Sequence, residues 1–143
     1  MRPLGVTLIG FYQILRGVVE LLFGLSLLLF TALAAKLAAL AVEGYAAGRF
    51  FGGFGYLAGL VIILFAALHL VAGYGVLRMQ NWGRLLTLFL SAIGLFLLLP
   101  VLVVVHGIPL VFGLINGASI FYLAMPPIKR AFHAAGNPLR MAA

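Results

Sequence analysis

The stretch LLTLFLSAIGLFLLLPVLVVVHGIPLVFGLINGASIFYLAMPPI, residues 85–128, contains no charged side chain. It is far longer than the roughly 20 apolar residues that cross a bilayer as a single helix. The motif HGIP at residues 106–109 interrupts it, because glycine followed closely by proline is typical of a turn before a new helix. We therefore expect two transmembrane helices here, over residues 85–105 and 110–125.

The composition of the whole chain agrees with a membrane protein. Of its 143 residues 66% are hydrophobic and 8% are charged, and the mean hydropathy is +1.29. Soluble domains carry about 25% charged residues, so a water-soluble globular fold is excluded. The apolar runs are continuous rather than alternating, which favours helices over a β-barrel. The chain has no cysteine, which excludes disulfides and thiolate chemistry.

Two further apolar segments precede residue 85, at residues 4–33 and 56–77. Together the four segments predict an all-α fold, a polytopic transmembrane four-helix bundle in which residues 1–143 form a single domain. Residues 126–143 would be a cytoplasmic tail, and residues 34–55 an outer loop.

The outer loop is rich in glycine, which we expect to break any helix. The glycines concerned are Gly44, Gly48, Gly52, Gly53 and Gly55. Residues 34–47 either extend the first helix or lie in the outer interface, and both possibilities are left open.

Basic residues predict the orientation of the four spans. The chain has nine Lys and Arg against two Glu, a net charge of +7. Lys36 and Arg49 fall on one side of the membrane, and a larger set falls on the other: Arg2, Arg78, Arg84, Lys129, Arg130 and Arg140. Because positive residues accumulate in the cytoplasm, both termini should lie there, in a multi-pass protein of the inner (plasma) membrane. The charge thus reports topology and not nucleic-acid binding; the basic tail either marks the cytoplasmic side or also lies on anionic lipid headgroups.

Small residues recur at a spacing of seven in the first span, and a stripe of this kind lets a neighbouring helix approach closely. The stripe consists of Gly10, Gly17 and Gly24, continued by Thr31 and Ala38. Gly55 with Gly59, and Gly113 with Gly117, show the GxxxG spacing that also favours helix packing.

Polar side chains inside the spans form a second pattern. Arg16 and Glu20 lie four residues apart on one helix face and are able to pair. Each charge costs about 2.5–3.5 kcal/mol in mid-membrane, so this span needs the ion pair or polar partners on other helices. We predict one buried polar layer in the cytoplasmic half, formed by Gln13, Arg16, Glu20, His69, Ser91 and Asn116.

Three hypotheses account for His69. It fixes helix register through hydrogen bonds, it belongs to a proton or ion relay, or it is the single protein ligand of a haem or chlorophyll-type pigment. A second histidine ligand is not expected, because His106 falls at the opposite face and His133 in the tail. No metal site is predicted.

No catalytic motif is present, and the chain contains no aspartate. We therefore expect a non-enzymatic protein. The leading hypothesis is an accessory or scaffold subunit of a larger membrane complex, with the lipid bilayer and other membrane subunits as partners. The alternative is a small transporter or proton-conducting protein, active as a homo-oligomer, that uses Arg16, Glu20 and His69.

Several short motifs resemble a widespread family of four-span bacterial and archaeal membrane proteins of unknown function. They are RPLGVT at 2–7, GYGVLR at 73–78, NWGR at 81–84, the stretch from Ile115-Asn116 to Tyr122-Leu123, and Pro127 with Ala131-Phe132. The chain differs in having Gly83 where alanine is usual, and in Arg16 and Glu20. The resemblance implies the four-span topology and no particular activity.

Overall fold

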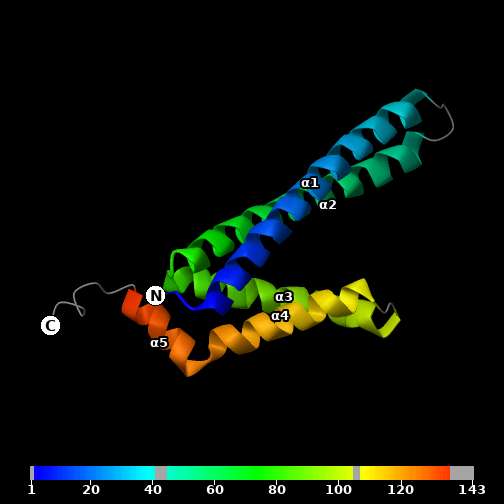
Figure 1. Ribbon diagram of the computed structural model, residues 1–143. Coiled ribbons are helices and arrows are strands. Elements are labelled where there is room, and N and C mark those ends of the chain that lie inside the picture. The colour runs from blue at the N-terminus through cyan, green and yellow to red at the C-terminus, as the bar shows by residue number, and fades with distance from the viewer. Residues whose placement is uncertain (1, 41–44, 105–106, 136–143) are drawn as a thin grey trace. The chain divides into compact units, whose positions relative to one another are not determined.

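A computed structural model describes residues 2–40, 45–104 and 107–135 of the chain. Within these ranges it consists of five α-helices and contains no strand (Figure 1). They are α1 (Leu4–Leu40), α2 (Tyr45–Leu77), α3 (Asn81–Val104), α4 (Ile108–Ala124) and α5 (Pro126–Ala135). The prediction of an all-α fold is confirmed.

The helices are long and apolar enough for three, or up to four, membrane crossings. The three candidate spans lie in α1, α2 and α3, at Leu4–Ala38, Gly52–Leu77 and Asn81–Pro100. The fourth candidate combines α4 with α5, which follows it after a bend of 67°. This set of helices indicates a membrane protein.

The expectation that glycines break any helix within residues 34–55 is wrong wherever the structure describes them. The first helix continues to Leu40, the second begins at Tyr45, and only residues 41–44 lie outside the described ranges. Each helical glycine costs about 1 kcal/mol relative to alanine. Leaving a backbone N–H or C=O group without a hydrogen bond in an apolar environment costs several kcal/mol, which is more than the cost of a glycine. A glycine-rich segment in an apolar environment therefore remains helical.

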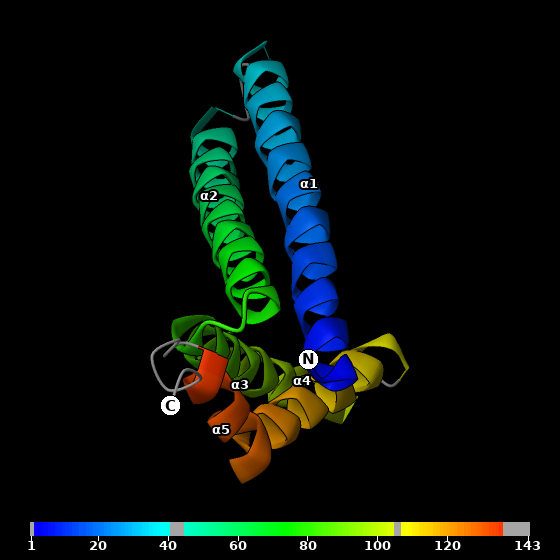
Figure 2. The ribbon, with the colours of Figure 1, turned by 60° about the vertical axis from the view of Figure 1, so that its left-hand side comes forward.

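Residues 15–70 form one compact unit, in which α1 and α2 run side by side in opposite directions (Figure 2). Small residues bring the two backbones together. A Cβ atom added to Gly17 would lie 2.9 Å from the carbonyl oxygen of Ala66, and one added to Gly24 would lie 3.1 Å from that of Gly59. The stripe of α1 therefore faces a second stripe on α2, Gly52, Gly59 and Ala66, with the same spacing of seven.

The second unit comprises residues 1–14 and 71–143, of which the structure describes 2–14, 71–104 and 107–135. In it α3 and α4 form an antiparallel hairpin (Figure 1). Its apolar core gathers residues from four helices: Val6, Val76, Leu123, Ile128 and Phe132. Residues 126–135, which belong to the predicted cytoplasmic tail, form a helix that packs onto this core through Ile128 and Phe132.

Two arginines in the second unit donate hydrogen bonds to carbonyl oxygens at helix ends. The last carbonyls of a helix lack partners within it, and a cation there is favourable. Arg2 Nη1 donates to the carbonyl oxygen of Leu77, in the last turn of α2. Arg84, which is buried, donates from Nη1 to the carbonyl oxygen of Leu123 in α4 (3.2 Å) and from Nε to Asn81 Oδ1 (3.0 Å).

The turn between α2 and α3 places these groups. Met79 has a positive φ of 55°; its N–H donates to Val76, and the N–H of Gln80 donates to Gly75. This pattern is a Schellman cap, which ends α2 and reverses the chain. Gly75 and Gly83 then lie in contact, since a Cβ atom on Gly75 would be 2.8 Å from the Cα atom of Gly83.

Candidate functional site

A charged cluster lies within the unit of residues 15–70. Arg16 and Glu20 are one turn apart on α1, and Arg16 Nε donates to Glu20 Oε1 over 2.7 Å. This is the i, i+4 geometry that lets two side chains of one helix pair. The second carboxylate oxygen of Glu20 remains available to a neighbouring helix.

His69 of α2 approaches that second oxygen. Its Nδ1 atom lies 2.8 Å from Glu20 Oε2 and 2.9 Å from the carbonyl oxygen of Phe65. Both neighbours are acceptors, so Nδ1 carries a hydrogen, which it donates to Phe65 while facing the carboxylate. Nε2 is buried and has no hydrogen-bond partner among the described residues, so it is the nitrogen left to accept a hydrogen bond or a ligand.

The helix contact explains why a glutamate reaches this histidine. Gly17 lies between Arg16 and Glu20 on α1, and Ala66 lies one turn before His69 on α2. Because the backbones of Gly17 and Ala66 nearly touch, the short carboxylate side chain spans the remaining gap. The packing stripe and the charged cluster are thus adjacent parts of one helix interface.

Burial within the cluster is uneven. The His69 side chain is 1% exposed, whereas those of Arg16 and Glu20 are 20% and 22% exposed. With His69 neutral, the guanidinium and the carboxylate cancel and the cluster carries no net charge. An ion pair of zero net charge lowers the cost of placing Arg16 and Glu20 in an apolar environment, although it does not abolish it.

The other three residues of the predicted polar layer belong to the second unit. Gln13 of α1, Ser91 of α3 and Asn116 of α4 are each completely buried, as is Thr87, one turn before Ser91. The structure therefore brings Arg16, Glu20 and His69 together. One continuous layer of all six residues stays a prediction.

The glycines expected to pack helices differ in their surroundings. Gly10, Gly17 and Gly24 are buried against α2, and Gly113 is buried in α4. Gly117 was expected to pack as well, but no described atom beyond its chain neighbours and the nearby backbone of α4 lies within 4 Å of a Cβ placed there. The buried face of α4 passes instead through Asn116, Ser119 and Leu123.

Two features of the second unit were missed by sequence reasoning. Arg84 was assigned to topology alone, although it is buried and binds the end of α4. A groove between the first turns of α1 and the second half of α4 was not foreseen either. The small residue Gly5 is the sequence feature that relates to the groove, because a Cβ atom there would lie 2.7 Å from the Tyr122 hydroxyl. The meaning of this glycine is evident only once the structure is known.

Comparison of the chain with known protein families, with curated proteins and with solved structures finds no match. The resemblance to a four-span family therefore stays a prediction. Within the described ranges, no group of three or more His, Cys, Asp or Glu is placed to hold a metal ion.

The charged pair is tested by a double-mutant cycle in detergent. Glu20→Leu leaves the Arg16 charge without its carboxylate, and we expect the unfolding free energy to fall by about 3 kcal/mol. Arg16→Leu combined with Glu20→Leu removes both charges, so most of that loss should be recovered. Thermal and denaturant unfolding of the purified variants measure both values.

Lys36→Leu is the control, because Lys36 is exposed on the same helix; we expect a change within about 0.5 kcal/mol. Arg16→Leu alone completes the cycle. If the double variant loses as much stability as Glu20→Leu and Arg16→Leu lose when added together, Arg16 and Glu20 are not coupled.

Proposed function

We propose that the chain is a four-span, non-enzymatic protein of the inner (plasma) membrane that acts as an accessory subunit of a larger membrane complex. In this proposal α1, α2, α3 and α4 each cross the bilayer, and both termini are cytoplasmic. The distribution of Lys and Arg supports the orientation. The bend between α4 and α5 supports a fourth span that ends where α5 begins.

The proposal of a partner subunit rests on the partial exposure of the Arg16–Glu20 pair. Arg16 and Glu20 each leave about a fifth of their side-chain surface exposed on α1. Only 11% of the most apolar stretch of α1 is buried, against 33% for those of α2 and α3. Charged surface facing lipid tails is unfavourable, whereas a further transmembrane helix on this face would cover it and supply hydrogen bonds.

A single-cysteine cross-link tests for such a helix, and the cysteine-free chain makes it specific. Phe23→Cys places a thiol one turn after Glu20, at an exposed position of α1. After labelling with a benzophenone maleimide and illumination of native membranes, we expect one stoichiometric adduct with a different membrane protein. Mass spectrometry of the adduct identifies the partner and the cross-linked helix.

Leu64→Cys is the matched control, because Leu64 of α2 is exposed to a similar extent, 59% against 61%. It should give no stoichiometric adduct. An adduct of Phe23→Cys with a second copy of the chain, or with lipid only, would contradict the proposal of a hetero-oligomeric subunit.

A proton relay is the second candidate function, and the Glu20–His69 contact favours it. An ionisable pair inside a transmembrane segment is a common element of proton paths. The Glu20 carboxylate bridges Arg16 and the buried imidazole, whose Nε2 is the next atom able to take up a proton. With relay activity, this cluster would transfer protons in addition to stabilising the contact between α1 and α2.

Proteoliposomes with an internal pH dye test the relay under an imposed membrane potential. We expect the wild-type protein to carry protons, and Glu20→Gln to reduce the rate at least about tenfold, since removing a proton-transfer group typically costs 10²–10⁴ in rate. Glu43→Gln, which changes the only other acid of the chain, should leave the rate unchanged. Equal rates for wild type, Glu20→Gln and empty liposomes would exclude the relay.

A further inference from the structure

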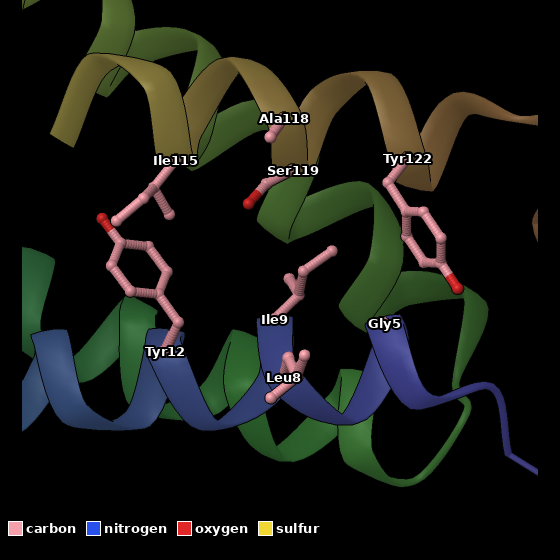
Figure 3. Close-up of a pocket in the computed structure, with 8 residues that line it drawn as sticks. All are labelled: Gly5, Leu8, Ile9, Tyr12, Ile115, Ala118, Ser119 and Tyr122. Atoms are coloured by element: carbon pink, nitrogen blue, oxygen red, sulfur yellow. The ribbon is translucent and has the colours of Figure 1, made fainter. Parts of the chain in front are cut away.

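The groove between α1 and α4 in the second unit is used by neither proposed function. It has a volume of about 400 Å³, within the roughly 300–1,000 Å³ of small-molecule sites. Each helix contributes four lining residues, which face one another across the gap (Figure 3). They are Gly5, Leu8, Ile9 and Tyr12 from α1, and Ile115, Ala118, Ser119 and Tyr122 from α4.

The shape and lining of the groove suit a hydrocarbon chain. From Gly5 to Tyr12 it follows two turns of α1, about 10 Å at 1.5 Å per residue. Its middle is formed by Leu8 and Ile9, with the Ser119 side chain directed into the gap, and a tyrosine lies at either end (Figure 3). Both helices belong to apolar segments, so acyl chains are the molecules available to fill the space.

Positive charge lies at one end of the groove. Arg2 precedes Gly5 by three residues and is exposed. Lys129 and Arg130 are exposed on α5, whose opposite face packs through Ile128 and Phe132 against Val6, the neighbour of Gly5. Residues 1–14 and 71–143 contain no acidic side chain, so no side chain of this unit offsets the charge of these cations.

We propose that the groove binds an anionic phospholipid, with one acyl chain between α1 and α4 and the phosphate near Arg2, Lys129 and Arg130. Charge complementarity selects an anionic headgroup over a neutral one. The amphipathic α5 presents its basic face to the headgroup layer while its apolar face is held in the protein core. This inference is independent of the proposed subunit and relay functions.

Native mass spectrometry of the delipidated protein, titrated with phosphatidylglycerol or phosphatidylcholine of identical chains, tests the headgroup. We expect one phosphatidylglycerol to bind at least about tenfold more tightly than phosphatidylcholine. Lys129→Gln combined with Arg130→Gln should weaken phosphatidylglycerol binding by roughly fivefold per charge and leave phosphatidylcholine binding unchanged. Lys36→Gln, which removes a charge elsewhere on α1, should have no effect.

Filling the groove tests its location. Ala118→Phe occupies the gap and should abolish tight phosphatidylglycerol binding, whereas Ala92→Phe, at an exposed position of α3 outside the groove, should not. The thermal midpoint of each variant shows whether it is folded, and Ala118→Leu replaces Ala118→Phe if the larger side chain is not tolerated.

Three results would overturn the proposal. Equal affinity for the two lipids would mean that the headgroup is not recognised. Unchanged binding in the folded Ala118 variant would place the lipid elsewhere. Dimers of the delipidated protein that Ala118→Phe disrupts would mean that a second copy of the chain occupies the groove.

Discussion

The carboxylate of Glu20 is the constraint on which the helix pair of residues 15–70 depends. It lies in an apolar segment, where an unpaired charge is unfavourable by several kcal/mol. Arg16 neutralises one oxygen from the same helix, and His69 approaches the other from α2. Each contact involves only one of the two carboxylate oxygens. Because the contact with His69 forms only when α2 lies in this register against α1, the Glu20 side chain fixes that register.

The close approach of the two backbones makes this arrangement possible. Gly17 and Gly24 on α1 lie against Ala66 and Gly59 on α2, and any larger side chain at these glycines would meet backbone atoms. Between transmembrane helices, dispersion contacts and short polar interactions replace the hydrophobic effect as the source of cohesion.

In the second unit, polar contacts also hold helices together, because Arg2 and Arg84 donate to carbonyl groups at the ends of α2 and α4.

Features that follow from one helix could be predicted from the sequence. Apolar run length predicts the helical segments, a spacing of four predicts the Arg16–Glu20 pair, and a spacing of seven predicts the buried face of α1. Features that depend on two helices could not be derived in the same way. Depth along the spans was enough to place Glu20 and His69 in one predicted layer, but their direct contact required the register of α2. The burial of Arg84 required the end of α4 beside α3.

The glycine-rich segment before residue 56 shows a different limit. Glycine clusters normally indicate loops, because glycine disfavours helices in water. In an apolar environment the hydrogen bonds of the backbone outweigh that preference, and glycine becomes a contact residue: a Cβ on Gly55 would lie 2.6 Å from Thr31 Oγ1. A glycine cluster therefore indicates a loop in a water-soluble protein and a helix contact in a membrane protein.

The contact between Glu20 and His69 is the central claim, and solid-state NMR in lipid bilayers tests it most directly. The chain has two glutamates and three histidines, so ¹³C-labelled glutamate and ¹⁵N-labelled histidine give nearly unique signals. We expect dipolar dephasing of the Glu20 carboxylate by His69 Nδ1, consistent with the 2.8 Å separation of Nδ1 and Oε2, and its disappearance in His69→Leu. A carboxylate signal that dephases no more in the wild type than in His69→Leu would contradict it.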